Sequence, residues 1–285
     1  MGLLLITRFT LHEAMRKRIF LAVVVLSVVL LLGFAILFNF VVDASNGPPQ
    51  LSHDLFLLGI GGFMSIPAIW LVYLLSSVLT ILLTTNMLSG EIDAGTFTII
   101  VPKPIHRFEI VFGKWLCYVL LLTAYTASLF FVFLVVIYLK TNYWPSDALR
   151  ALGILELAVL VLMGLTTCGS AFVPTMVNGA IILVLFIGAQ ISSFINLIAP
   201  FVAPSAKDNV QNTTTVISLI MPTDALWHGS SFYLTSGAST LLQAAHINTP
   251  FTSTEPIAAA LLVWAVIYAL VLPLCGAWRF QYRDL

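Results

Sequence analysis

Six long apolar runs dominate this chain of 285 residues and restrict what it can fold into. A helix needs about 20 consecutive apolar residues to cross the hydrocarbon core of a bilayer. Only 8% of the residues are charged, whereas soluble domains carry about 25%. The sequence therefore predicts an all-α polytopic membrane protein with six transmembrane helices, over residues 19–42, 63–88, 115–138, 151–172, 179–201 and 257–278.

The first apolar run is interpreted as a retained span rather than a cleavable signal peptide. Its apolar stretch is much longer than the roughly 7–15 residues of a signal-peptide core. The chain is therefore expected to be a single transmembrane domain over residues 1–285.

The placement of lysine and arginine predicts the orientation in the membrane, because these residues collect on the cytoplasmic side. Only three of the twelve, Lys140, Arg150 and Lys207, fall on the outer side if the N-terminus lies inside. The other nine are Arg8, Arg16, Lys17, Arg18, Lys103, Arg107, Lys114, Arg279 and Arg283. Both termini are therefore expected in the cytoplasm, and the chain in the inner (cytoplasmic) cell membrane.

The segments between the runs differ in character. Residues 1–18 end in a basic triplet and are predicted to form an interfacial elbow helix held by lipid phosphates; the alternative is a frayed basic tail. Residues 43–62 are rich in Gly and Pro and are expected to form an outer loop. Residues 202–256 are expected to hold one or two short extracytoplasmic helices on the outer surface, one of them capped by Thr223 or Asp224.

A polar segment at residues 88–114 separates the second apolar run from the third. It carries six of the 24 charged residues. Pro102 and Pro104 end one helix, because proline lacks an N–H and restricts the residue before it. A new helix can start at His106, with Glu109 as half of a capping box. The pattern predicts a short, stiff cytoplasmic helix that docks a cytosolic partner; the alternative is an ordinary charged loop.

Seven residues of this segment carry a resemblance to a known family. They stand in the order and spacing typical of permease subunits of the type-2 ABC export family: Glu91, Gly95, Thr96, Pro104, Arg107, Gly113 and Lys114. In that family the segment, here residues 89–114, is the coupling helix. His106 departs from the pattern, because the family often has Ser or Thr there. The layout is similar to that of the permease branch that serves nitrous oxide reductase maturation.

The resemblance implies a half-transporter that is not an enzyme by itself. Partner docking falls to Glu91, Gly95, Thr96, Pro104, Arg107 and Lys114. The chain has no Gly-rich phosphate-binding loop, so ATP and Mg are expected on a separate ATP-binding-cassette subunit and no cofactor is expected here. A second permease copy, identical or related, and the lipid bilayer are the other expected partners. An extracytoplasmic accessory protein is a further candidate, and no nucleic acid is expected.

A few polar residues lie within the apolar runs. Glu156 is the only carboxylate that lies well inside one of the predicted spans. Ionisable groups within a membrane span are functional candidates. Folding the fourth and fifth runs about a turn near residue 175 predicts that Glu156 contacts Ser193 or Asn196, which share a helix face with Gln190. The cluster either lines a substrate or proton path or forms a structural hydrogen bond. The five histidines show no metal-ligand spacing, so no metal site is expected.

Three other functions are weighed against the permease. A stand-alone secondary carrier or channel needs broken helices or charged pairs at mid-membrane, for which Glu156 alone is weak support. A membrane enzyme needs a cluster of reactive side chains at one face. A membrane anchor that transmits force to an extracytoplasmic partner through residues 202–256 remains the third alternative.

Overall fold

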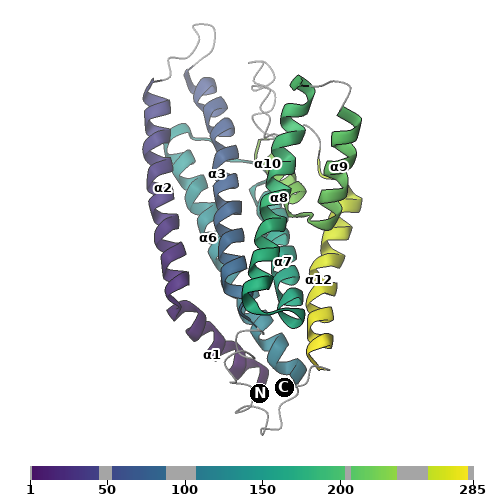
Figure 1. Cartoon of the computed structure of the whole chain (residues 1–285). Coiled ribbons are helices and arrows are strands. Elements are labelled where there is room, and N and C mark those ends of the chain that lie inside the picture. Colours follow the sequence, from purple (N-terminus) through teal and green to yellow (C-terminus); the bar gives the residue numbers. More distant parts are fainter. Residues whose placement is uncertain (1, 45–52, 88–106, 203–206, 236–255, 282–285) are drawn as a thin grey trace.

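The computed structural model describes residues 2–44, 53–87, 107–202, 207–235 and 256–281. Within these ranges the chain forms helices and no strands, arranged as an elongated bundle (Figure 1). The helices are α1 (Gly2–Arg16), α2 (Arg18–Ala44), α3 (His53–Thr84), α6 (Arg107–Thr141), α7 (Ala148–Phe172), α8 (Thr175–Val202), α9 (Lys207–Ile220), α10 (Thr223–Thr235) and α12 (Ala259–Gln281).

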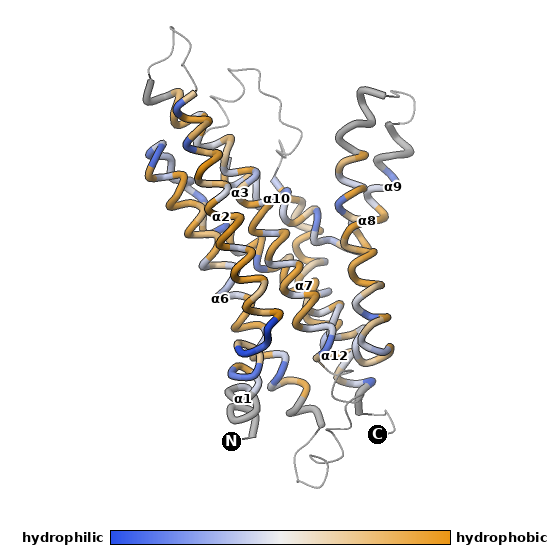
Figure 2. The backbone as a smooth tube through the Cα atoms, turned by 60° about the vertical axis from the view of Figure 1, so that its left-hand side comes forward, coloured by the Kyte–Doolittle hydropathy of each residue, from blue (hydrophilic) through white to orange (hydrophobic). Residues whose placement is uncertain are grey.

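Six of these helices are long and apolar enough to cross a membrane. The candidate spans are Arg18–Ala44, Phe56–Thr84, Val111–Thr141, Ala148–Phe172, Thr175–Ile195 and Ala259–Arg279. Figure 2 shows hydrophobic residues along most of their length. The predicted all-α, multi-pass architecture with six spans is therefore confirmed, and the chain is a membrane protein by this criterion.

The second span begins earlier than the sequence predicts. Residues 53–62 were expected in a Gly-rich loop but belong to α3. A Cβ atom on Gly61 would lie 2.5 Å from both Thr141 Oγ1 and Tyr143 Cβ. Glycine is thus needed here for the close approach of α3 to the end of α6, and it does not mark a loop.

One end of the bundle is marked by α1 and is named the α1 end. At the α1 end lie α1, the last turn of α3 and the first turn of α6, together with the N-terminus and the C-terminus (Figure 1). The chain is not helical at Lys17, which separates α1 from α2. Helix α2 runs along the bundle, whereas α1 crosses the α1 end of the bundle toward α6.

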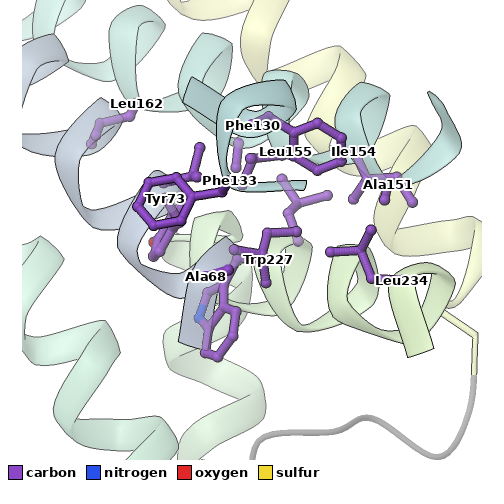
Figure 3. Packing of buried hydrophobic residues seen from close by; sticks show 14 of the residues in the cluster. Ala68, Tyr73, Phe130, Phe133, Ala151, Ile154, Leu155, Leu162, Trp227 and Leu234 are labelled. Atoms are coloured by element: carbon purple, nitrogen blue, oxygen red, sulfur yellow. The ribbon is translucent and has the colours of Figure 1, made fainter. Parts of the chain in front are cut away.

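The largest cluster of buried side chains lies between α3, α6, α7 and α10 (Figure 3). Tyr73 of α3 stacks on Trp227 of α10, with 6.0 Å between ring centroids. Ser230 of α10 donates a hydrogen bond of 2.6 Å to the carbonyl of Ala151 on α7. Tyr143 donates one of 2.5 Å to the carbonyl of Leu234. Helix α10 is therefore buried within the bundle, whereas the sequence predicted a helix lying on the outer surface.

Close packing of α7 and α12 depends on small residues. A Cβ atom on Gly276 would lie 3.1 Å from Cys168 Cα and 3.2 Å from the Thr167 carbonyl oxygen. Both contacts are with backbone, which cannot move away as a flexible side chain can. Small residues at helix contacts are typical of membrane proteins, where close approach of backbones replaces the hydrophobic effect as the driving force.

Two glycine substitutions test this packing. Gly276→Ala is expected to lower the free energy of unfolding by about 1–3 kcal/mol, because the added methyl group pushes α12 off α7. Gly153→Ala, on α7 where nothing lies within 4 Å of the added atom, is expected to be neutral or to stabilise by about 0.5–1 kcal/mol. Thermal unfolding in detergent measures both. Equal effects of the two substitutions would contradict the assigned contact.

Candidate functional site

The first candidate site is the base of the polar segment at the α1 end. Residues 88–106 lie outside the described residues, and with them Glu91, Gly95, Thr96 and Pro104. Helix α6 begins at Arg107, one residue from the predicted start, although the side chain of Arg107 is not described. Of the predicted docking residues, the structure therefore places only Lys114 in full.

Lys114 joins the two helices that flank the polar segment. Its side chain is 7% exposed, and its ammonium group donates a 3.4 Å hydrogen bond to the carbonyl of Met87, just beyond the last turn of α3. The two residues are 27 positions apart in the sequence. Lys114 therefore acts within the chain, where it holds the two ends of the segment together, while the sequence predicted a residue that faces a partner.

Helix α1 packs on the same place. Thr7 donates a 3.1 Å hydrogen bond to the carbonyl of Gly113, next to Lys114. Ala14, on the same face of α1 as Thr7, is fully buried. At the end of α1, Lys17 pairs with Glu13 at 3.2 Å. The base of α6 is thus held by α1 on one side and by α3 on the other.

The environment of Lys17 keeps this corner charged. Burial lowers the pKa of the ammonium group, but the neighbouring Tyr118 of α6 and Glu13 raise it by more, so that the net shift is upward. A cation that stays charged at physiological pH is thereby fixed where α1 meets α6.

The predicted contact between Glu156 and Ser193 is not formed. The Ser193 hydroxyl donates instead to the carboxylate of Asp224 on α10. Near the turn between α7 and α8, the side-chain amide of Asn178 donates a 3.0 Å hydrogen bond to the Thr166 carbonyl. The side chain of Asn196 is outside the described residues, and the buried side-chain nitrogen of Gln190 has no hydrogen-bond partner among the described residues.

Both carboxyl oxygens of Glu156 are buried without a hydrogen-bond partner among the described residues. The hydroxyl of Thr123 on α6 lies beside the carboxyl group, but not in the geometry of a hydrogen bond. Glu156 therefore faces α6, and not the α8 residues with which the sequence grouped it.

A second polar group, which sequence analysis missed, surrounds Asp224 in the first turn of α10. Asp224 is only 8% exposed. Its carboxylate accepts a short hydrogen bond from the Ser193 hydroxyl of α8 and one of 3.0 Å from the indole N–H of Trp227. Nε2 of His228 lies 3.9 Å from the same carboxylate. These residues link α8 to α10.

Two further hydroxyl groups lie next to this carboxylate. Those of Tyr73 and Thr223 are fully buried and make no hydrogen bond of good geometry among the described residues, although they lie close to one another. The sequence signal for the group is the pairing of Asp224 and His228 one helical turn apart, beginning two residues after Pro222. It was overlooked because α10 was interpreted as a surface helix.

The described residues contain no group of three or more His, Cys, Asp or Glu side chains that could hold a metal ion. The side chains at both places offer hydrogen bonding and ion pairing. The first place suits the transmission of movement between helices, and the second suits the binding of a positive charge.

Replacing the buried cation tests the base of the polar segment. Lys114→Met keeps the length of the side chain and removes the donor to Met87, so the ends of α3 and α6 are expected to open more easily, by about 1 kcal/mol. Hydrogen exchange of amides near Met87 and Gly113 measures the change. Lys140→Met, an exposed lysine at the other end of α6, is the matched control and is expected to leave that exchange unchanged.

The unpartnered carboxyl group of Glu156 gives a separate prediction. Glu156→Met is expected to raise the free energy of unfolding by about 1–3 kcal/mol, because burying a polar group without hydrogen bonds is unfavourable. Thermal unfolding in detergent measures this against Asp147→Asn, which alters a partly exposed carboxylate paired with Arg150. A destabilised Glu156→Met variant would show that the carboxyl group has a partner that supports the fold.

Comparison with known protein families agrees with this architecture. The model of the ABC-2 family transporter protein matches residues 5–285, nearly the whole chain. Comparison with curated proteins gives no match. With six candidate spans and a family match from end to end, the chain belongs to the ABC-2 family of transporter membrane proteins.

Proposed function

We propose that this protein is the permease subunit of an ATP-driven, export-type ABC transporter, coupled through residues 89–114 to a separate ATP-binding subunit. The observation that carries the proposal is the family match over residues 5–285, since permeases of this family lack an ATPase domain of their own. ATP and Mg are then bound by the partner, and this chain contributes the membrane path.

The geometry at the α1 end supports a coupling role for the polar segment. The segment leaves from the end of α3 and returns at the start of α6, and the Lys114–Met87 hydrogen bond joins these two points. Further along the same pair of helices, Thr126 donates a 3.0 Å hydrogen bond to Ser76. A force applied to the segment would therefore move α3 and α6 together rather than separately.

The α1 end is the proposed cytoplasmic side. It carries the basic residues Arg16, Lys17 and Arg18 where α1 meets α2, and Arg279 near the end of α12. Basic residues collect on the cytoplasmic side of membrane proteins. In this orientation α1 is the interfacial elbow helix, and α9 lies at the extracytoplasmic side, where an accessory protein would bind.

The transporter is proposed to contain two permease copies. The three least buried spans are those of α2, α8 and α12, so these helices offer the apolar surface on which a second copy can pack. Within the family, the layout of six spans with a basic elbow is the basis for placing the chain near the branch that serves nitrous oxide reductase maturation.

Charge reversal in the polar segment tests the coupling. Glu91→Lys and Arg107→Glu are each expected to reduce co-purification of the ATP-binding-cassette partner subunit by about tenfold or more, as expected for a loss of 1.4 kcal/mol. ATPase activity of the complex should fall in parallel. Lys140→Glu, at the other end of α6, is the control that should leave both unchanged.

Complexes of unchanged yield and activity in the two charge-reversal variants would contradict the docking role. Substrate movement by the purified chain alone in liposomes, without ATP, would favour the stand-alone carrier instead.

A further inference from the structure

The carboxylate of Asp224 lies deep in the bundle. The hydrogen bonds of Ser230 with Ala151 and of Tyr143 with Leu234 place the later turns of α10 at the start of α7 and the end of α6. Asp224 precedes Ser230 by six residues, or about 9 Å along the helix, so it lies farther from that end of the bundle. The hairpin of α9 and α10 thus carries an acidic residue close to its turn, between α3 and α8.

The groups that face this carboxylate are few. From its own helix these are His228 and Trp227, from α8 Ser193, and from α3 Tyr73. Among the described residues His228 is the one basic group that faces it, at 3.9 Å. A buried carboxylate needs a positive partner, because the loss of water around a single charge is very unfavourable. Burial accordingly raises the pKa of Asp224, against the opposing effects of His228, Ser193 and Trp227.

We propose that Asp224 and His228 form a proton-binding site whose occupancy controls how firmly α8 is held to α10. The ligand is a proton because the carboxylate already has donors at hydrogen-bond distance on both oxygens, Ser193 on one and Trp227 on the other. A proton binds without displacing either donor. It reaches the pair and leaves it through the side chain of His228, which is 24% exposed.

Proton binding changes the contact between the two helices. When the site is empty, the Ser193 hydroxyl donates to a full negative charge, which is the stronger kind of hydrogen bond. When the pair holds a proton, the charge on the carboxylate is neutralised or shared with the imidazolium, and the bond from Ser193 weakens. The two groups titrate as a pair, with one proton shared between them. Attachment of α8 to α10 should therefore loosen as the pH falls.

Trp227 provides a direct probe of the site. Its indole donates to Asp224 and packs on His228, with 4.0 Å between ring centroids. In the full-length protein in lipid nanodiscs, tryptophan fluorescence is expected to change with a single titration between about pH 5 and pH 8. The change should be absent in Asp224→Asn and in Trp227→Phe, and reduced or shifted in His228→Gln.

Glu156→Gln is the matched control, because it neutralises a buried carboxyl group that faces α6. It should titrate like the wild type. The infrared difference spectrum between about pH 5 and pH 8 should contain a carboxyl band. This band should be lost in Asp224→Asn and retained in Glu156→Gln. Hydrogen exchange in residues 186–195, corrected for the intrinsic effect of pH, should be faster at the lower pH in the wild type alone.

A titration in Asp224→Asn that matches the wild type would overturn the proposal, as would a wild-type protein without any transition in this range. If Asp224→Asn does not elute as a folded protein in size-exclusion chromatography, His228→Gln and Ser193→Ala test the proposal instead. His228→Gln must alter the fluorescence titration, and Ser193→Ala must remove the pH dependence of exchange in α8. The test needs no ATP-binding subunit, so its outcome is independent of the proposed transport function.

Discussion

The dry interior of the bundle is the constraint on which the structure depends, because every polar group inside it must find a partner within the protein. Hydroxyl groups of the described spans donate to carbonyls of their own helix: Thr80 donates to that of Ser76 at 2.7 Å and Thr141 to that of Ile137 at 2.9 Å. Others also reach a neighbouring helix, as Thr84 does with Thr166 at 2.5 Å. The buried polar atoms of Glu156, Tyr73 and Thr223 stand out because they have no hydrogen-bond partner in the part of the chain that the structure describes.

Helix α3 connects the two polar places of the structure. Near its end Met87 receives the hydrogen bond of Lys114 at the base of the polar segment. Midway along the helix, Tyr73 stacks on Trp227 beside the carboxylate of Asp224. A displacement of the polar segment can therefore be passed along one continuous helix to the hairpin that carries Asp224. This gives the proposed coupling a physical route from the α1 end to the middle of the bundle.

The sequence predicted the spans well, because a run of about 20 apolar residues has few alternatives to a membrane helix. It failed where tertiary contacts decide. Gly61 suggested a loop, yet glycine is there for the approach of α3 to Thr141 and Tyr143. A hairpin turn near residue 175 predicts which residues of α8 lie at the same height as Glu156. It does not predict the direction of the Glu156 side chain, which faces α6. Burial of Asp224 was invisible because it depends on α3 and α8 together.

The most direct test of the coupling account is a cross-link from the polar segment. In a background without Cys117, Cys168 and Cys275, Gly95→Cys carrying a photoactivatable label should cross-link to the ATP-binding-cassette subunit. The same label on Ser146→Cys, at the other end of the bundle, should not. Cross-linking from residue 146 alone, or from neither position in an active complex, would contradict the proposal that the polar segment receives the force of ATP hydrolysis.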